Sequence, residues 1–519
     1  MNCGCGRVSA ALVALGLLAS CGGGGGGGGG SSGGEGHDPL AALQWHLTGS
    51  HEGQATVHID ALGLDVNGHG VTVAVIDDGM DIDHEDLRDG VLDFNRSYLP
   101  RGLTFDDAPH GTAVAGIIAA RQGNGRGGQG VAPGAALVAY NVLRAPAMAN
   151  FADALVRDIQ RVDIYNNSWG DFSGWGVPLP LHPGIETALR EGTRAGRSGK
   201  GTVYVFSAGN GAQSGGGGLP ADNVNWSGLV NNPWTMAICA VDHQGRRALY
   251  SEHGATLWVC APSSGAGQGT GAGAGIVTTD LSGERGYNDG RSGERDLADS
   301  NYTRRFGGTS AAAPMVAGVA ALMLEANPEL GWRDVKAILA LTARRIDEGE
   351  ADWTRNGAGL WVSHAYGFGL VQARAAVALA RGWSNLPASA LVTISSGRVA
   401  EIADAGNATV DALHSATDEL VEFVEVEVDI PEHPRLSDLE IVLVGPSGTR
   451  SVLAELHHQQ FDEFRLRQWR FGSARHLGER SVGVWRLEVR DLRPGQAGTL
   501  RGWKLRLHVA PGRESLTAR

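Results

Sequence analysis

The sequence predicts an α/β domain with a doubly wound, mostly parallel sheet, followed by an all-β sandwich. Short apolar runs rich in β-branched residues alternate with segments of helical periodicity over the first part of the chain. Towards the C-terminus the pattern changes to alternation of apolar and polar residues, which is typical of half-buried antiparallel strands. With 519 residues, the chain is long enough for two or three domains and a large core.

The predicted parallel strands are short apolar runs, as expected where both faces of a sheet are covered. They are Val71–Ile76, Ala136–Val142, Asp163–Asn166, Thr202–Phe206, Met236–Val241 and Leu257–Ala261. Helices are predicted at Thr112–Ala120, Ala149–Arg161, Gly184–Ala195, Ala311–Ala326, Trp332–Thr342 and Val371–Arg381. Ligands of such sheets bind at the carboxyl ends of the strands, and Asp77 and Asn210 both fall at such ends.

The predicted sandwich has antiparallel strands at Val421–Asp429, Asp438–Val444, Val484–Val489 and Trp503–Val509. Turn residues separate them, at Gly445–Gly448 and Arg493–Gly495. The expected organisation is therefore a first domain over 38–383, a linker over 384–393, a sandwich over 394–511 and a tail over 512–519.

The first 37 residues predict export and a membrane anchor. Arg7 precedes the apolar run Val8–Ala19, which is too short to span a bilayer and is typical of a signal peptide. The run ends in Leu18-Ala19-Ser20-Cys21, which resembles a bacterial lipobox and implies a lipid on Cys21 after cleavage of 1–21. The glycine tract that begins at Gly22 and extends to residue 37 is expected to be a flexible tether to an outer membrane. A plain secretory signal, giving a secreted or periplasmic protein, is the alternative.

Composition argues against nucleic acid as a partner and does not decide whether the two cysteines outside the leader form a disulfide. The net charge is −13 and no long basic run occurs, so nucleic acid is not an expected partner. Outside the leader only Cys239 and Cys260 remain, each on a predicted strand. In an exported protein these two can form a disulfide or stay as buried thiols.

Four motifs carry candidate chemistry: Val73–Gly79, His110–Gly116, Val205–Asn210 and Gly307–Pro314. Ser310 follows a glycine pair and precedes a small-residue helix, so its hydroxyl lies where unpaired backbone N–H groups converge. Alone, this serine is an ordinary N-cap. The order Asp77, His110, Ser310 is however one of the known orders of a Ser-His-Asp triad.

With these motifs, the region from Asp38 to Val509 resembles the subtilisin-like serine proteases, and within them the kexin/furin branch. The resemblance implies a serine endopeptidase acting on protein or peptide substrates, expected to be a monomer. It assigns Ser310 as the nucleophile, His110 as the general base and Asp77 as the carboxylate that orients the imidazole. Asn210 is assigned to the oxyanion together with the Ser310 backbone N–H.

The sandwich resembles the P (Homo B) domain of the same branch. Its motifs are His433–Glu440, Gly445–Ser451, Trp485–Val489 and Gly498–Leu500. The adjacent His457 and His458 are expected on a solvated loop rather than at a metal. The resemblance also implies an inhibitory folding prodomain, for which the segment ahead of Asp38 has no room.

The resemblance further implies how a peptide is held. Ser168, Trp169 and Gly170 match the edge strand that pairs with an extended substrate. Asp78 and Asp107 match an acidic pair that receives a basic side chain two residues before the cut bond. The acids expected around the residue at the cut itself are replaced by Ser173 and Ser227, so a looser preference is expected there.

Calcium is the cofactor that the resemblance implies. Side chains of Asp38, Asp86 and Asn124 match one site, with carbonyl groups of Arg121, Arg126 and Gly128. Asp222 and Glu252 match a second site, with Asp171 as a further ligand; solvated surface charges are the alternative.

Two other functions share these residues. One is a surface binding or adhesin module on a protease scaffold that no longer cuts, against which the complete set Asp77, His110, Asn210 and Ser310 argues. The other is hydrolysis of small esters, which uses the same triad.

Overall fold

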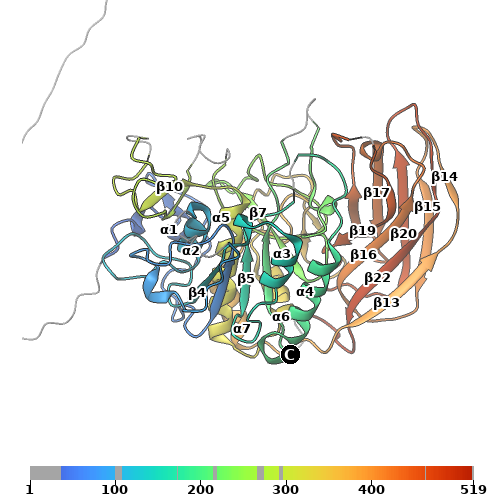
Figure 1. Cartoon of the computed structure of the whole chain (residues 1–519). Helices are drawn as coiled ribbons and strands as arrows, with labels where there is room; N and C mark the ends of the chain where they lie inside the picture. The colour runs from blue at the N-terminus through green and yellow to red at the C-terminus, as the bar shows by residue number, and fades with distance from the viewer. Residues whose placement is uncertain are drawn as a thin grey trace, which may run out of the picture. The chain divides into compact units, whose positions relative to one another are not determined.

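A parallel sheet of six strands organises the first part of the chain, in the order β4-β3-β5-β6-β7-β8 (Figure 1). The strands are β3 (Thr72–Ile76), β4 (Ala136–Tyr140), β5 (Ile164–Asn167), β6 (Val203–Ser207), β7 (Thr235–Val241) and β8 (Leu257–Pro262). The computed structural model describes residues 37–99, 108–171, 174–213, 219–265, 274–291, 296–461 and 463–516. The predicted signal segment, Cys21 and the glycine tract lie outside these ranges. The predicted α/β fold followed by a β-sandwich is confirmed.

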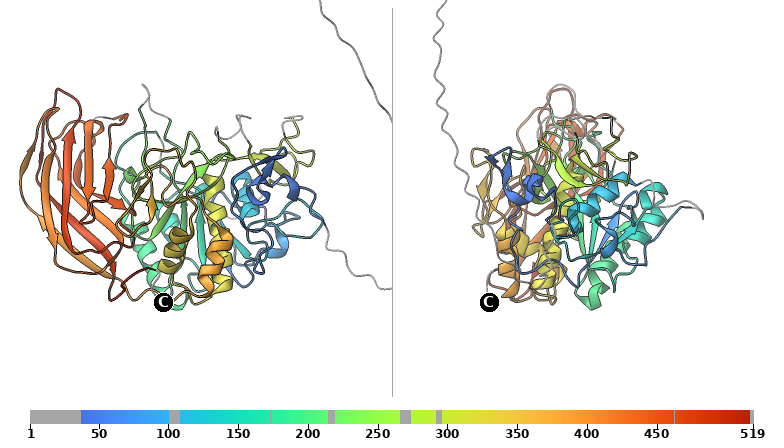
Figure 2. Two further views of the ribbon diagram at one scale, coloured as in Figure 1. Left: turned by 180° about the vertical axis from the view of Figure 1, so that it is seen from behind. Right: turned by 90° about the vertical axis from the view of Figure 1, so that its left-hand side faces the viewer.

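Helices cover both faces of this sheet, because alternate side chains of each buried strand point to opposite faces. On β3, Val73 and Val75 join one apolar layer, while Ala74 and Ile76 join the other. The larger helices are α2 (Pro109–Ala119), α3 (Met148–Ala154), α4 (Pro183–Ala195), α5 (Thr309–Ala326), α6 (Trp332–Thr342) and α7 (Ala373–Arg381). Figure 2 shows the sheet between these helices from two further directions.

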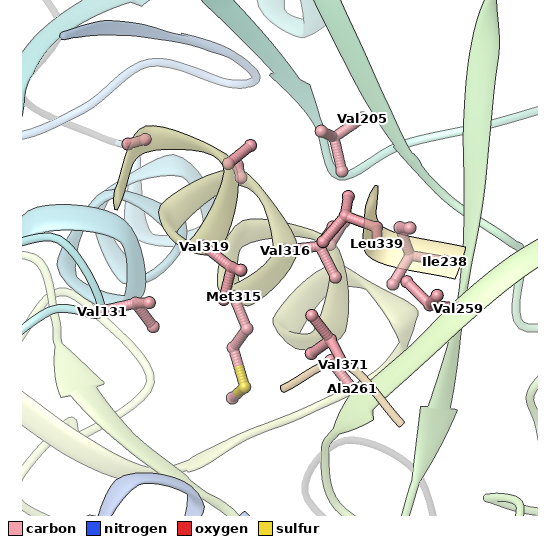
Figure 3. Close-up of a cluster of buried hydrophobic side chains, with 14 of the residues drawn as sticks. Val131, Val205, Ile238, Val259, Ala261, Met315, Val316, Val319, Leu339 and Val371 are labelled. Carbon is pink, nitrogen blue, oxygen red and sulfur yellow. The ribbon is translucent and has the colours of Figure 1, made fainter. Parts of the chain in front are cut away.

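Helix α5 is the central helix of one layer. Its Val316 faces apolar side chains of β6, β7 and β8, while Met315 and Val319 lie in the same core on the side of Val131 (Figure 3). By length and composition α5 is apolar enough to cross a bilayer, but 89% of it is buried inside the protein. It is therefore a core helix, and its small residues allow close approach to the strands.

The predicted helix Ala149–Arg161 is wrong in its second half. Helix α3 ends at Ala154, and the chain then runs through turns to Arg161. Asp158 has a positive φ of 58°, which a continuing helix does not accept. The Tyr165 hydroxyl bonds to the carbonyl of Arg157, so tertiary contacts to the sheet replace helical bonds here.

A disulfide joins Cys239 and Cys260, the alternative that the sequence left open. The two residues are paired neighbours on the adjacent strands β7 and β8. Both are fully buried, so the bond lies within the core of the sheet domain.

The second part of the chain has two four-stranded antiparallel sheets, β13-β22-β16-β19 and β15-β20-β17-β18, with the pair β14-β21. The strands are β13 (Ala390–Ser396), β14 (Ala400–Ile402), β15 (Thr409–Ser415), β16 (Leu420–Ile430), β17 (Leu439–Val444), β18 (Arg450–Ala454), β19 (Leu466–Ser473), β20 (Gly483–Asp491), β21 (Gly498–Leu500) and β22 (Gly502–Ala510). Strand β13 pairs with β22 and begins inside the range expected for the linker. The apolar faces of the sheets form one core, with Trp485 and Phe471 fully buried.

Short elements complete the described structure. They are α1 (Trp45–Thr48) and the antiparallel pairs β1 (Ser50–His51) with β2 (Gln54–Ala55), β9 (Ile276–Thr279) with β10 (Tyr302–Phe306), and β11 (Thr354–Arg355) with β12 (Trp361–Val362).

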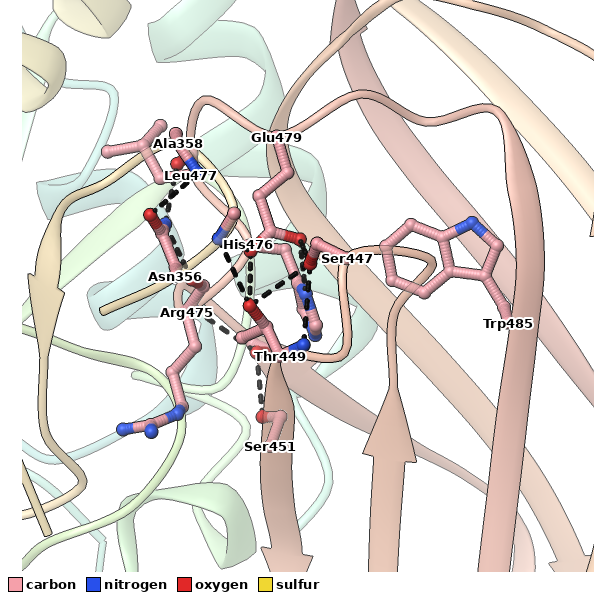
Figure 4. A network of polar contacts seen from close by, with 12 residues as sticks. Asn356, Ala358, Ser447, Thr449, Ser451, Arg475, His476, Leu477, Glu479 and Trp485 are labelled. Carbon is pink, nitrogen blue, oxygen red and sulfur yellow. Dashed lines mark hydrogen bonds and ion pairs between the residues drawn. The ribbon is translucent and has the colours of Figure 1, made fainter. Parts of the chain in front are cut away.

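Buried polar bonds tie the sandwich to the sheet domain. The Gly357 N–H donates to Glu479 Oε1 at 2.6 Å, and Asn356 Nδ2 donates to the Leu477 carbonyl at 2.9 Å. Figure 4 shows Glu479 also receiving bonds from Ser447 and Thr449 of the sandwich. Glu479 has donors from both domains, and the Leu477 carbonyl of the sandwich accepts its bond from the sheet domain, so separating the domains would leave polar groups unpaired.

The expectation of a solvated loop at His457 is wrong. Its side chain is buried, and Nε2 lies 2.9 Å from the Gly176 carbonyl of the sheet domain. The ring lies 5.1 Å from the indole of Trp226, centroid to centroid. A sequence pattern cannot show this, because the covering surface comes from another domain.

Candidate active site

Asp77 follows β3 directly and is fully buried at the carboxyl end of the sheet. Its Oδ1 accepts a hydrogen bond of 2.8 Å from His110 Nδ1 and another of 2.8 Å from the Asp78 N–H. Oδ2 is buried and has no hydrogen-bond partner among the described residues. The carboxylate therefore fixes the imidazole with Nδ1 as the donor, which directs Nε2 away from Asp77.

His110 is the second residue of α2, whose start is packed closely against the turn after β3. A Cβ added at Gly111 would lie 1.8 Å from the Gly79 carbonyl oxygen, so only glycine permits this approach. Phe306 packs its ring 5.4 Å from the imidazole. Burial lowers the pKa of His110, but the charge and hydrogen bond of Asp77 outweigh it and raise the pKa above its ordinary value.

Ser310 is the second residue of α5 and follows Gly308, whose φ is +76°. Its Oγ donates to the Ser168 carbonyl at 3.2 Å, while Ser168 Oγ donates to the Ser310 carbonyl at 3.0 Å. No hydrogen bond joins Ser310 to His110 within the described residues. The hydroxyl lies at the helix N-terminus, where backbone N–H groups point outwards.

Asn210 follows β6, separated from it by a turn. Its Oδ1 accepts bonds from the Thr309 N–H and the Thr309 hydroxyl, both at 2.9 Å. Among the described residues none accepts a hydrogen bond from Nδ2, so the amide nitrogen remains for a ligand. Thr309 therefore orients this amide. It belongs to the motif Gly307–Pro314, but the sequence analysis assigned it no role.

A cavity open to solvent lies beside these groups, and the empty space in it, including the solvent at its mouth, is about 550 Å³. Its lining contains Ser310 and Asn210, the segment Ser168–Gly170 that was predicted to pair with substrate, and the adjacent Asp171. The remaining lining residues are Val177, Leu179, Ser207, Ala208, Gly209, Asp222, Asn223, Trp226, Ser227, Val230 and Glu252. The cavity thus has a mixed lining in which polar and acidic side chains lie beside apolar ones, and the sequence did not predict the contribution of Trp226.

The acids of this wall are linked electrostatically. Glu252 is buried, and burial followed by the charge of Asp222 raises its pKa well above the ordinary value. Burial also raises the pKa of Asp222, whose oxygens accept backbone N–H bonds from Gly174 and Gly176. Ser227 Oγ donates to Asp171 at 2.6 Å. A cation near these carboxylates would offset their mutual repulsion.

Asp78 is engaged in holding the start of α2. Its Oδ1 accepts from the Gly111 N–H at 2.8 Å and its Oδ2 from the His110 N–H at 3.3 Å. Burial, followed by the neighbouring charge of Asp77, raises the pKa of Asp78 to about 7. Its expected partner Asp107 lies outside the described residues, as does Ser173.

The residues of the first expected calcium site lie together. Asp38 accepts backbone N–H bonds from Gly123 and Asn124, and Asn124 Nδ2 donates to Asp86 Oδ1 at 2.7 Å. Asp86 Oδ2 is buried without a partner among the described residues, and a Cβ at Gly127 would lie 2.4 Å from it. Burial raises the pKa of Asp86 to about 7, and the charge of Asp38 adds to the rise.

The donor set has the character of a calcium site. Oxygen atoms come from the two carboxylates, and the glycine-rich loop that follows contains Arg121, Arg126 and Gly128, whose carbonyls are the other expected ligands. The Asn124 amide directs Nδ2 to Asp86, while its Oδ1 accepts the Arg126 N–H at 2.9 Å. Within the described residues no three His, Cys, Asp or Glu side chains gather as a metal-binding group. Asp38 and Asp86 therefore fit a site for a hard cation in which carboxylate and backbone carbonyl oxygens both serve as ligands.

Two family models match the chain, one over each of its parts. The model of the Subtilase family matches residues 68–369, and that of the proprotein convertase P-domain matches residues 421–507.

Whole-chain relatives extend over both parts. The chain is 32% identical to kexin of Saccharomyces cerevisiae over 491 residues, which is 91% of this chain and 56% of kexin. It is 34% identical to proprotein convertase subtilisin/kexin type 7 of Mus musculus, covering 91% of this chain and 61% of that protein. The chain thus spans about three fifths of these relatives.

A solved structure is similar over almost its full length. The serine protease of Aeromonas sobria, in a complex with a chaperone, has a TM-score of 0.82 and 28% identity. The match covers 92% of this chain and 96% of that one. Both domains of the present chain therefore have counterparts in a solved protein.

Proposed function

The chain belongs to the Subtilase family, and from this premise we propose that it is a serine endopeptidase that cleaves protein or peptide substrates. The observation that carries the proposal is the 2.8 Å bond between the buried Asp77 and His110. It lies at the carboxyl edge of the sheet, as does a cavity lined by Ser310. The complete set of groups disfavours the alternative of a binding module that does not cut.

In each half of the reaction His110 takes up one proton and gives it up again: the serine proton goes to the leaving amine, and a proton of water returns to Ser310 Oγ. Ser310 Oγ turns from the Ser168 carbonyl towards His110 Nε2, gives up its proton and attacks the peptide carbonyl. Asp77 stabilises the imidazolium that forms. The imidazolium then donates its proton to the leaving amine, and an acyl-enzyme remains on Ser310. Water, deprotonated by the same imidazole, hydrolyses this ester and restores the serine.

The developing oxyanion lies between Asn210 Nδ2 and the backbone N–H of Ser310 in this proposal. The bonds from Thr309 to Asn210 Oδ1 support it, because they fix the amide before substrate arrives. Such preorganisation matters most in a site from which water is excluded. Loss of one such donor typically costs about 2.7–4 kcal/mol in the activation free energy.

Substrate is proposed to lie along Ser168, Trp169 and Gly170 as an added strand. We propose a preference for Lys or Arg two residues before the cut bond, received by Asp78 and Asp107. The charge of Asp78 supports this preference, although its backbone bonds to α2 restrict its movement. The test is a cleavage profile of the wild type beside Asp107→Asn; tolerance of apolar residues at that position in the wild type contradicts the pocket.

The activity itself is tested with a fluorophosphonate probe and a peptide library. We expect the probe to label Ser310, and Ser310→Ala to lose both labelling and peptide cleavage while keeping its circular dichroism spectrum. Ser395→Ala is the control, since it removes one hydroxyl from the exposed face of β13, away from the cavity. A folded wild type that binds peptides without cutting them supports the binding module, and cleavage of small esters alone supports an esterase.

We further propose that calcium stabilises the fold. Subtilases commonly bind calcium, and the unpartnered Asp86 Oδ2 supports a cation held by Asp38, Asp86 and Asn124 with the carbonyls of the following loop. A second cation would be held by Asp222 and Glu252, with Asp171. When bound, calcium would offset the repulsion between the carboxylates, and it takes no part in the proton transfers.

Chelation tests the first site. A ligand that binds only the native state stabilises it by about 2.7 kcal/mol at roughly a hundredfold excess over Kd. We therefore expect EDTA to lower the melting temperature of the wild type, and to have little effect on Asp86→Asn. Asp89→Asn, an exposed acid nearby, is the control and should respond as the wild type does. An unchanged wild-type melting temperature contradicts the site.

For localisation, we propose export and a lipid anchor at Cys21. The support is the lipobox-like sequence followed by the glycine tract. Mass spectrometry of the mature N-terminus tests it: an acylated Cys21 is expected, and an unmodified N-terminus at another residue contradicts the anchor.

A further inference from the structure

One loop of the sandwich domain, residues 455–461, lies against the outer wall of the active-site cavity. The Gln460 N–H donates to the Trp175 carbonyl at 2.9 Å, and the His458 N–H donates to the Pro220 carbonyl at 2.8 Å. Asn223 Nδ2 donates to Glu455 Oε1 at 3.0 Å. The loop therefore bonds to the two segments that carry Asp222 and Val177 into the cavity.

His457 makes the central contact of this loop. Its Nε2 lies 2.9 Å from the Gly176 carbonyl and its Nδ1 lies 2.8 Å from the Glu455 carbonyl. In any protonation state at least one of these is an N–H···O bond, because an imidazole always carries one proton. Gly176 itself has a φ of +60°, and a Cβ there would lie 2.0 Å from the His458 carbonyl oxygen.

The same imidazole packs against Trp226, one of the residues that line the cavity. It lies 5.1 Å from the Trp226 indole, which lines the cavity on its other side. Phe471 of the sandwich packs at 5.3 Å from that indole, and Trp226 is only 3% exposed. Trp226 is thus held in position by side chains of the sandwich domain.

Asp222 completes the connection. Its carboxylate accepts the N–H groups of Gly174 and Gly176, and the carbonyl of Gly176 faces His457. A change at His457 therefore reaches Asp222 through one residue of backbone. The wall that would contact the side chain before the cut bond consists of sheet-domain residues, and the sandwich domain supports it through His457.

We propose that His457 is a positioning residue for substrate selection, which holds Trp226 and the Gly176–Asp222 wall in the geometry that accepts the side chain before the cut bond. The inference rests on the proposed endopeptidase function and assigns part of its specificity to the sandwich domain. His457 does not touch the reacting atoms, so its effect is on KM and selectivity rather than on the chemical step.

General loosening of the domain interface is the rival explanation, and the interface offers a matched control. Arg333 donates to Glu422 through Nε at 2.6 Å, linking α6 to β16. Neither residue lines the active-site cavity. Glu422→Gln therefore weakens the same interface without contacting the wall.

The experiment profiles cleavage of a peptide library by the wild type, His457→Ala, His457→Gln and Glu422→Gln. We expect His457→Ala to raise KM about tenfold, to reduce discrimination at the residue before the cut, and to change kcat less than threefold. His457→Gln keeps one donor and should recover part of the selectivity. Glu422→Gln should retain the wild-type KM and profile, even where its melting temperature falls. Equal changes in Glu422→Gln, or an unchanged profile in a folded His457→Ala, overturn the inference.

Binding separates this inference from the proposed function. Fluorescein-labelled tetrapeptide amides, varied at the last residue, are titrated by anisotropy against Ser310→Ala and against the double variant with His457→Ala. A Kd about tenfold higher, with less dependence on the last residue, supports the inference even if the wild type cuts nothing. Identical Kd values overturn it while leaving cleavage by the wild type intact.

Discussion

Among the described residues, two Asp–His pairs share the same bond from Nδ1 and differ in their surroundings. In one, His110 Nδ1 lies 2.8 Å from Asp77; in the other, His364 Nδ1 lies 2.8 Å from Asp352. The pairs differ at the opposite nitrogen. His364 Nε2 accepts the Val452 N–H of the sandwich domain at 2.9 Å, whereas no described residue bonds to His110 Nε2.

The charges around the two imidazoles differ as well. Burial lowers the pKa of both. At His364 the positive charge of Arg475 lowers the pKa further, so the net shift is downward. At His110 the charges of Asp77 and Asp78 reverse the effect of burial. An Asp–His pair is therefore a candidate base only where the second nitrogen is open, and otherwise it is a structural bridge.

The largest expected difference between the pairs is in catalysis. Asp77→Asn should lower kcat about 10⁴-fold, because the amide no longer fixes the tautomer that leaves Nε2 as the base. Asp352→Asn should leave kcat close to that of the wild type. Steady-state kinetics on one peptide measures both; a similar loss in the two variants would show that the second pair also serves the reaction.

For the free energy of unfolding, we expect the substitution at Asp352 to have the larger effect of the two. Asp352 accepts bonds from the Ser363 hydroxyl at 2.8 Å and from the His364 backbone as well as its ring. We expect Asp352→Asn to reduce the free energy of unfolding by about 1–3 kcal/mol, since it leaves a buried group with one acceptor fewer. Urea denaturation measures this, with exposed Asp418→Asn as the control. No change in Asp352→Asn contradicts the bridge between domains.

The two histidines should respond to pH with opposite signs. The raised pKa of His110 favours its charged form in the folded state, so its contribution to stability is present below about pH 6.5 and is lost as pH rises through the raised value. The lowered pKa of His364 gives a contribution present above about pH 6.5 and lost as pH falls. NMR titration of the two imidazoles checks the order of protonation. His364 titrating first on acidification would refute the comparison.

The smallest expected effect is on the pH at which kcat/KM falls on acidification. Asp78→Asn removes a charge that raises the pKa of His110, so kcat/KM should begin to fall at lower pH than in the wild type. The shift should be about one pH unit or less, because Asp78 itself titrates near pH 7 and carries only part of its charge there. A pH–rate profile measures the shift; movement to higher pH would show that the carboxylate acts on another group.

The sequence alone determined the sheet of the first domain. Each parallel strand was predicted to within two residues at both ends, because strands buried on both faces must be short, apolar runs. The same pattern placed Asp77 and Asn210 after strands and His110 and Ser310 at the starts of helices. The roles of these residues came from the family resemblance. The bond between Asp77 and His110 supports the roles proposed for these two residues.

Only the tertiary structure decided the features that depend on contacts between residues far apart in the sequence. The Cys239–Cys260 bond follows from strands that lie side by side, which spacing along the sequence does not reveal. The end of α3 at Ala154 follows from contacts made by the residues after it. His457 resembled a solvated residue because its neighbours in sequence are polar, and it is buried because Trp226 and Gly176 of another domain cover it. Local patterns record which faces are apolar, whereas the identity of the covering surface is set only when distant segments pack together.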